Sequence, residues 1–326
     1  MSENRDWRPG ASAGALAARA RMLQGLRAFF AARGVLEVET PVLARAASTD
    51  VHLESLEVGD ARGEVGYLHT SPEFFMKRLL AAGSGPVYQV ARVFRAGEIG
   101  RWHNPEFTML EWYRPGFDLD QLMDEVEALL RHLAHDMPVQ PGPTRKLGYR
   151  QAFVEHVGID PWTADKDALA RCAGRHGLDV EHGEDLGRDD WLDLLFSSVL
   201  APRLPQDGFT FVHGFPPSQA ALAKKTVRDG FEVAARFELF WGELELANGF
   251  DELQDAEEQA LRFAADNAER ERRGLPAMPP DERLIGALRV GLPACAGVAV
   301  GLDRLLARLL GAGRLDEVLA FGFDRV

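Results

Sequence analysis

The stretch from Phe107 to Tyr113 restricts the fold most, because its side chains alternate between two faces as they must in a β-strand. One face holds Thr108, Leu110 and Trp112, and the other holds Phe107, Met109, Glu111 and Tyr113. The first face suits a hydrophobic core. The second face places the carboxylate of Glu111 between apolar neighbours, where an unpaired charge is costly. The pattern predicts a strand in which Glu111 needs a polar partner.

Further strands and helices follow one another along the chain. Apolar residues recur at helical spacing in 22–30, where Gly34 is the expected C-cap, and in 118–135. A polar helix is expected at 255–273, and a last helix begins near Leu302. Strands are expected at 35–39, at 209–215 and in a hairpin of 231–240 with 243–250, whereas helices predominate between about 147 and 200. Strands separated by helices predict an α+β fold with an antiparallel sheet, as one domain over residues 1–326.

Composition excludes several classes of protein. The net charge of −13 over 326 residues argues against a broad nucleic-acid footprint, which needs a basic surface. The chain has no apolar run of membrane length, and its first ten residues lack the hydrophobic core of a signal peptide, so we expect a cytoplasmic protein with no membrane contact. The two cysteines form no CxxC pair. Motifs of the GxxxxGK[ST], GxGxxG, HExxH and GxSxG types are absent, so any nucleotide site belongs to another class.

The hairpin FELFWGELELANGF carries two glutamates that need an explanation. A two-residue turn at Trp241-Gly242 would place Glu238 directly opposite Glu245, and like charges opposite each other destabilise a sheet. Either both side chains point into water, or a divalent cation lies between them. Asn248-Gly249 is the expected position of a bulge. Such a bulge would return Glu252 to the face that carries Glu245.

Five segments in order resemble the class II aminoacyl-tRNA synthetases. Motif 1 is matched by GVLEVETPVL (34–43), motif 2 by VYQVARVFRAGEIGRWHNPEFTMLEWY (87–113) and motif 3 by GVAVGLDRLLARLLG (297–311). The segments HTSPEFFMKRLL and ELANGFDEL are similar to the lysyl branch. The resemblance implies the class II catalytic fold, a mainly antiparallel sheet flanked by helices. It also implies a homodimer, because motif 1 builds the dimer interface in these enzymes.

The segment before motif 1 narrows the resemblance further. It has 33 residues, whereas a domain such as the anticodon-binding OB-fold of a lysyl-tRNA synthetase needs on the order of 50 or more. We therefore expect a catalytic domain without an anticodon-binding domain. This resembles the lysyl-tRNA synthetase paralogues that attach β-lysine to a lysine of translation elongation factor P. The implied reaction partners are ATP, Mg²⁺, β-lysine or lysine, and elongation factor P, with tRNA disfavoured.

The resemblance implies an ATP site built from motifs 2 and 3. Arg95 would bridge the substrate carboxylate and the α-phosphate, which suits a bidentate guanidinium. Arg304 would hold the γ-phosphate, and these two arginines are the candidate catalytic residues. Glu238 and Glu245 would be the metal ligands. The remaining residues implied for ATP are Ala96, Gly97, Glu98, His103, Asn104, Phe107, Leu246 and Gly301, with Phe107 stacked on adenine or simply packed in the core.

The resemblance also implies an amino-acid pocket. Glu73 would bind the substrate's α- or β-amine, although TSPE at 70–73 also reads as a capping box that explains Glu73 by structure alone. Glu252 would hold the side-chain ammonium, with support from Asn248. Other implied contacts are Ser71, Pro72, Tyr113 and Ala299. No role is assigned to Glu111 beyond facing this pocket.

Two departures from the synthetase pattern matter. Arg95 is followed by Ala96-Gly97-Glu98 where the family has Asn-Glu, so the usual glutamate is missing at Gly97 and Glu98 lies one place late. Ala299 stands where lysyl-tRNA synthetases have glycine, and its methyl group is the expected source of a preference for β-lysine over lysine. The alternative functions are a free-standing enzyme that charges tRNA and an inactive regulatory paralogue. The intact set of Arg95, Glu238, Glu245 and Arg304 argues against the latter.

Overall fold

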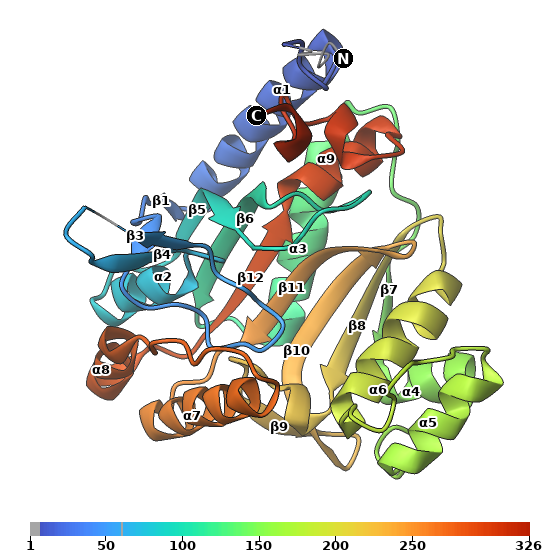
Figure 1. The fold of residues 1–326 in the computed structure, drawn as a ribbon. Helices are drawn as coiled ribbons and strands as arrows, with labels where there is room; N and C mark the ends of the chain where they lie inside the picture. The colour runs from blue at the N-terminus through green and yellow to red at the C-terminus, as the bar shows by residue number, and fades with distance from the viewer. Residues whose placement is uncertain (1–6, 60) are drawn as a thin grey trace, which may run out of the picture.

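The structure, a computed structural model, describes residues 7–59 and 61–326 and is organised around one large sheet (Figure 1). Its strand order is β1-β5-β6-β12-β11-β10-β8-β7, and β9 pairs with β10. The pairs β1/β5 and β7/β8 are parallel and the others antiparallel, which confirms the mainly antiparallel α+β fold. In that order the strands are Leu36–Glu37, Val87–Phe94, Glu106–Pro115, Cys295–Gly301, Leu244–Asp251, Phe231–Trp241, Phe209–Phe215 and Arg145–Gly148, with β9 at Lys225–Arg228.

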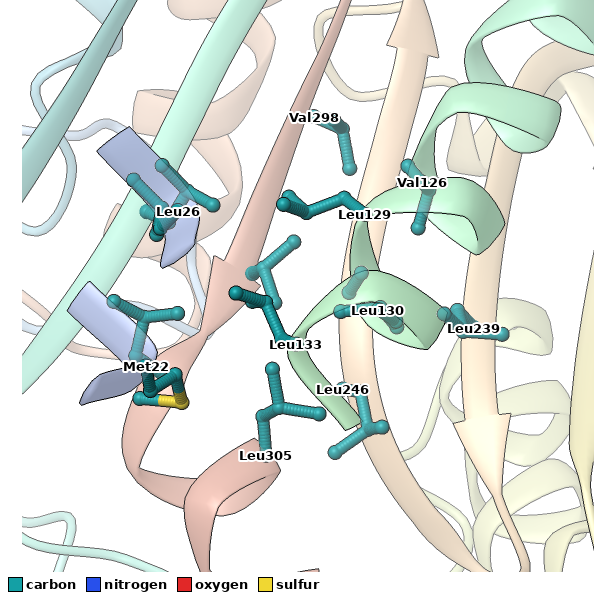
Figure 2. Close-up of a cluster of buried hydrophobic side chains, with 14 of the residues drawn as sticks. Met22, Leu26, Val126, Leu129, Leu130, Leu133, Leu239, Leu246, Val298 and Leu305 are labelled. Carbon is teal, nitrogen blue, oxygen red and sulfur yellow. The ribbon is translucent and has the colours of Figure 1, made fainter. Parts of the chain in front are cut away.

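Three helices cover one face of this sheet. They are α1 (Ala13–Ala31), α3 (Leu119–Ala134) and α9 (Leu302–Leu310). Their apolar stripes meet alternate residues of β6, β10, β11 and β12 in the main hydrophobic core. Figure 2 shows leucines of α3 between Met22 and Leu26 of α1 on one side and Leu239 and Leu246 of the sheet on the other. The predicted helix at 118–135 is confirmed, and Asp118 and Gln121 form its capping box.

The opposite face of the sheet is bordered by smaller units. The first is α2 (Glu73–Ala81) with a three-stranded sheet of β2 (Leu43–Ala44), β4 (Val65–Leu68) and β3 (Glu57–Gly59). The second is α7 (Ala256–Arg272) with α8 (Glu282–Gly291), and the third comprises α4 (Tyr149–Ala152), α5 (Lys166–Arg175) and α6 (Arg188–Leu195) around a core of their own. None of the described helices has the length and apolarity to cross a membrane. Residues 1–6, on which the expectation about a signal peptide partly rests, lie outside the described part.

Two local predictions near motif 1 need correction. The strand expected at 35–39 is limited to Leu36–Glu37, because beyond Val38 the chain leaves the edge of the sheet. Gly34 has the left-handed φ of 64°, but the C-cap is Ala32, and Gly34 takes up the reversal two residues later. The helix therefore ends at Ala31, one residue beyond the predicted stretch 22–30, and the chain reverses direction at Gly34.

The register predicted for the β10–β11 hairpin is wrong. The turn is Gly242-Glu243 rather than Trp241-Gly242, so Trp241 pairs with Leu244 and Phe240 with Glu245. A bulge follows, because Leu239 pairs with Ala247 and leaves Leu246 as the extra residue. Glu238 therefore lies opposite Asn248, not opposite Glu245.

The predicted bulge exists, but not at Asn248-Gly249. It lies at Leu246, where two successive side chains, Leu246 and Ala247, both enter the helix-covered core. Gly249 has a different reason to be glycine, because a Cβ there would overlap the ring of Phe237. The extra residue has the expected effect, since Glu245 and Glu252 both line the open face.

Candidate active site

The open face of the sheet forms the floor of a large cleft with a cavity volume of about 1330 Å³. Alternation along the strands decides what lies there. In β6, Leu110 and Trp112 enter the helix-covered core, whereas Met109, Glu111 and Tyr113 line the cleft, as the sequence pattern predicts. The structure brings these predicted site residues together in the cleft: Ser71, Glu73, Arg95, His103, Tyr113, Glu238, Glu245, Asn248, Glu252, Ala299 and Arg304.

Glu111 finds its polar partners at one end of the cleft. Its Oε1 accepts from the hydroxyl of Tyr113 at 2.6 Å and its Oε2 from Ser71 Oγ at 2.7 Å. Burial, reinforced by the charge of Glu73, raises the pKa of Glu111 to about 7 even though these hydrogen bonds favour the ionised form. Glu111 therefore fixes the hydroxyls of two predicted substrate contacts, which answers the question raised by its position in the strand.

A lysine that the sequence reading missed lies at the same end. Lys77, on α2, is 2% exposed, and its Nζ lies 2.6 Å from Glu73 Oε1 and 2.6 Å from Glu252 Oε2. The i,i+4 spacing of Glu73 and Lys77 was visible in the sequence, but the contact with Glu252 depends on the tertiary fold. Lys77 therefore joins the two carboxylates that were predicted to bind the substrate's amines.

The capping box predicted at 70–73 does not form. Pro72, which is buried, is the N-cap of α2 and makes no side-chain cap. The hydroxyl of Ser71 accepts from the backbone N–H of Glu73 at 3.0 Å and donates to Glu111. The carboxylate of Glu73 points to Lys77 instead of back to the helix start. Capping thus does not explain Glu73.

Gly297, in β12, leaves the space in which two of these side chains lie. A Cβ at this position would overlap the ring of Tyr113 and lie 2.6 Å from Glu252 Oε1. Two positions along, Ala299 sits between Glu111 of β6 and Asn248 of β11 in the pairing register. The methyl group of Ala299 therefore projects from the floor between two polar residues, Glu111 and Asn248.

Arg95, which follows β5, lines the cleft. Its Nε is buried without a hydrogen-bond partner, and its nearest carboxylate is Glu98 Oε1, 3.5 Å from Nη1. The guanidinium lies 5.1 Å from the centre of the Phe107 ring. Gly97, between Arg95 and Glu98, has a φ of 76°, a conformation that favours glycine. Glu98, which lies one position later than the expected glutamate, thus reaches Arg95, although its distance of 3.5 Å is at the upper limit for a hydrogen bond.

The other end of the cleft contains Arg304 and His103. Arg304 Nε donates to the carbonyl of Trp102 at 3.1 Å and Nη1 to that of Glu245 at 3.2 Å, which fixes the guanidinium at the start of α9. Its Nη1 also lies 3.7 Å from the Glu245 carboxylate. Burial and the charge of Arg304 lower the pKa of His103. This lowering favours the neutral form of the imidazole.

Not every residue implied for ATP lies on the cleft. Asn104 Nδ2 donates to the carbonyl of Glu106 at 2.6 Å and its Oδ1 accepts from Phe323 N at 2.9 Å, so both ends are engaged away from the cleft. The side chain of Leu246 belongs to the core behind the sheet. Only backbone atoms of Leu246 remain available to a nucleotide. The other predicted residues that do not line the cleft are Pro72, Ala96, Gly97, Glu98, Phe107 and Gly301.

Negative charge gathers around Glu238. Burial raises its pKa to about 8, opposed by Arg236 and reinforced by Glu245 and Asp193. Burial also raises the pKa of Asp193 to about 6. Within the described residues no group of three or more potential ligands has a metal-binding arrangement. Glu238 forms an ion pair with Arg236, and Glu245 lies 3.7 Å from Arg304, so this chain partly neutralises both carboxylates. Their oxygens fit Mg²⁺, a hard cation that keeps its other ligands from water and phosphate.

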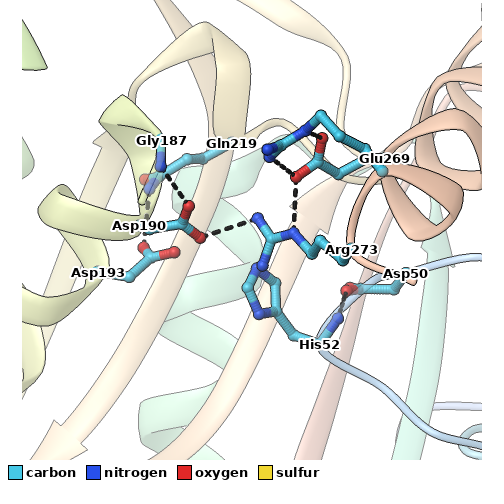
Figure 3. A network of polar contacts seen from close by, with 9 residues as sticks. Asp50, His52, Gly187, Asp190, Asp193, Gln219, Glu269 and Arg273 are labelled. Carbon is cyan, nitrogen blue, oxygen red and sulfur yellow. Dashed lines mark hydrogen bonds and ion pairs between the residues drawn. The ribbon is translucent and has the colours of Figure 1, made fainter. Parts of the chain in front are cut away.

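The outer wall of the cleft is closed by a polar network (Figure 3). Arg273, at the end of α7, reaches Asp190 of α6 with Nη2 2.9 Å from Oδ1, and its Nε lies 2.6 Å from Glu269 Oε1. Asp190 Oδ2 also accepts from the N–H of Gly187 at 2.7 Å. This contact connects the helical unit of α4–α6 to α7 beside the cleft.

A comparison with known proteins identifies the fold family. A family model described as tRNA synthetases class II (D, K and N) matches residues 4–325. The chain belongs to this class II family. Two of its similar relatives carry the name elongation factor P--(R)-beta-lysine ligase. The protein from Salmonella arizonae is 49% identical over 332 residues, which span 100% of both chains, and that from Proteus mirabilis is 48% identical over 98% of both.

This class II chain is an ATP-dependent ligase, since the family and the named relatives agree on that class of enzyme. Its polar cleft lies on the face of the sheet that the three core helices leave open, and strand alternation supplies most of the polar floor. Sequence reasoning missed two residues of this cleft. Lys77 bridges Glu73 and Glu252, and Gly297 leaves room for the ring of Tyr113.

Proposed function

We propose that this chain activates (R)-β-lysine, and lysine more weakly, as an aminoacyl-adenylate and transfers it to a lysine ε-amine of translation elongation factor P. The observation that carries the proposal is the pairing in one cleft of Arg95 with two carboxylates, Glu73 and Glu252. This set fits a substrate with one carboxylate and two amines. The relatives that match over the full chain are named for this reaction. An acceptor that is a translation factor implies a cytoplasmic enzyme.

The chemistry needs positioning more than it needs a catalytic base. The substrate carboxylate is already a nucleophile, so it attacks the ATP α-phosphorus, and the bond to pyrophosphate breaks. Arg95 orients the carboxylate and neutralises charge on the α-phosphate, while Arg304 does so at the γ-phosphate. Mg²⁺ held by Glu238 and Glu245 would supply further charge neutralisation. The acceptor ε-amine then attacks the adenylate carbonyl, and AMP leaves.

A homodimer is part of the proposal. The apolar side chains Leu36, Val42 and Leu43 of motif 1 are exposed, next to the edge strand β1. Exposed apolar side chains beside a sheet edge suit contact with a second copy. Light scattering at micromolar concentration is expected to give twice the 36.0 kDa of one chain. A mass of one chain would contradict it.

Activation of a diamino acid is tested by pyrophosphate exchange with Mg²⁺. Exchange is expected with β-lysine and, more weakly, with lysine. Background exchange with both would contradict the proposal and favour the inactive regulatory paralogue. The second alternative, an enzyme that charges tRNA, is disfavoured by the net charge of −13, which does not suit a large anionic partner.

Ala299 is expected to set the preference between the two lysine isomers. Its methyl group lies between Glu111 and Asn248 in the strand register, and moving the amine from the α to the β carbon changes its distance from that wall. A methyl-sized contact discriminates by about 10- to 200-fold. Ala299→Gly is therefore expected to relax the preference for β-lysine, measured as the ratio of kcat/KM values in pyrophosphate exchange. An unchanged ratio would place the selectivity elsewhere.

A further inference from the structure

The amino-acid end of the cleft holds more buried charge than binding of two amines requires. Three carboxylates, Glu73, Glu111 and Glu252, meet there around the ammonium of Lys77. Glu111 and Glu252 are 2% and 1% exposed, and Lys77 is 2% exposed. Buried charges are retained in proteins only where they are paired or used. A lysine that already occupies both amine-binding carboxylates therefore needs an explanation.

Lys77 leaves one oxygen of the Glu252 carboxylate free. It contacts Glu73 through Oε1 and Glu252 through Oε2. Glu252 Oε1 is buried, has no hydrogen-bond partner, and lies beside Gly297 on the lining of the cleft. An unpartnered carboxylate oxygen at such depth is costly unless a ligand cation reaches it. Lys77 thus turns the second oxygen of Glu252 toward the substrate.

When Glu73, Glu111 and Glu252 are ionised, their three negative charges and the ammonium of Lys77 leave this end of the cleft with two negative charges. A diamino acid brings two ammonium groups to match them, and its carboxylate is received by Arg95. We infer that Lys77 is a positioning residue that holds Glu73 and Glu252 in place and sets the charge of this end of the cleft to match a substrate with two amines. The inference rests on the proposed function and deepens it.

Shifts of pKa agree with an excess of negative charge. Burial raises the pKa of Glu252 to about 8, with Lys77 acting against the rise and Glu73 and Glu111 adding to it. Burial alone would lower the pKa of Lys77, but the charges of Glu252 and Glu73 raise it, so it stays an ammonium. The ionisable groups around Lys77 are Glu73 of α2, Glu252 after β11, Glu111 and Tyr113 of β6, and Cys295 of β12.

Removal of the Lys77 charge is expected to change the pH dependence of activation. In Lys77→Met the carboxylate of Glu252 loses a cation at contact distance, so its pKa rises. The ammonium groups of the substrate need ionised carboxylates. The rising limb of kcat/KM for lysine in pyrophosphate exchange should therefore move to higher pH. Each unit of upward pKa shift should lower kcat/KM about tenfold at pH 6.5, and this loss should be smaller at pH 8.5. Lys77→Arg, which keeps the charge, should keep the wild-type limb.

A matched control and a second measurement separate this role from a structural one. Lys166→Met removes a half-buried lysine that does not line the cleft and should leave the pH profile unchanged. If Lys77→Met folds and loses the same factor at every pH, or nothing, the inference is wrong. Should Lys77→Met not fold, Lys77→Gln gives the same comparison, because it removes the charge but keeps a polar group at the position. A Lys77→Gln profile that overlays that of the wild type would overturn the inference.

The outcome for the proposed function is read separately. Wild-type protein that forms no adenylate with lysine or β-lysine would contradict the proposed function itself. Wild-type protein that forms the adenylate, beside a Lys77→Met variant with an unshifted profile, would contradict only the role of Lys77.

Discussion

Arg95→Ala is expected to reduce pyrophosphate exchange by a factor of about 10²–10³ or more, the range found when one preorganised charge-stabilising donor is removed from an active site. The guanidinium lines the cleft, its Nε is buried without a partner, and its ion pair with Glu98 is at 3.5 Å. It is therefore held ready for a ligand rather than used by the protein. Arg95→Lys should recover little, because an ammonium cannot make the planar double contact.

The matched control for Arg95 is an arginine of β5, the strand that directly precedes it. Arg92, in β5, is exposed, with its guanidinium 3.6 Å from Glu106 on the surface. Arg92→Ala should keep exchange near the wild-type value, since exposed ion pairs contribute little. Equal losses in the two variants would mean that general positive charge, not the position of Arg95, matters. Undiminished exchange in Arg95→Ala would remove Arg95 from the mechanism.

Gly297→Ala is expected to lower kcat/KM for lysine by about 10²-fold, since misplacement by about 1 Å can cost that much. The added Cβ would overlap the ring of Tyr113 and lie 2.6 Å from Glu252 Oε1, and both residues are almost fully buried. Neither can move without disturbing Glu111, which accepts from the Tyr113 hydroxyl, or Lys77, which holds Glu252. The loss should therefore come from the amino-acid end of the cleft.

A second glycine provides the control for this substitution. Gly286 lies in α8, and a Cβ there would meet no atom within 4 Å. Gly286→Ala should preserve activity and slightly raise the melting temperature, because alanine favours the helix. Wild-type KM for lysine in Gly297→Ala would contradict the assigned location of the substrate. Circular dichroism of both variants separates loss of the site from loss of the fold.

The fold follows closely from patterns that are local in the sequence. Alternation from Phe107 to Tyr113 separates the core face from the cleft face of β6, and helical spacing places α3 and α7 within a residue or two. The register of the β10–β11 hairpin does not follow. A bulge at Leu246 depends on two adjacent apolar side chains, Leu246 and Ala247, both packing under the helices, and that preference is set by tertiary contacts.

In the candidate site, too, some features follow from local sequence and others depend on tertiary contacts. Carboxylates and arginines in the motifs are recognisable one by one, and most of them do line one cleft. Their partners are harder to predict. Lys77 lies between Met76 and Arg78 of α2 and looks like an ordinary helix lysine until Glu252, far along the chain, reaches it. Asn104, which looks like a nucleotide contact, is instead engaged by the backbone of Glu106 and Phe323.

The most direct test of the central claim is the identity of the acceptor. Purified protein is incubated with ATP, Mg²⁺ and β-lysine, with elongation factor P in one reaction and tRNA in another, and both acceptors are analysed by mass spectrometry. The account predicts that elongation factor P gains the mass of one β-lysyl group on a lysine, that tRNA gains none, and that Arg95→Ala abolishes the gain. Efficient charging of tRNA with no change in elongation factor P would contradict it and support the free-standing tRNA synthetase instead.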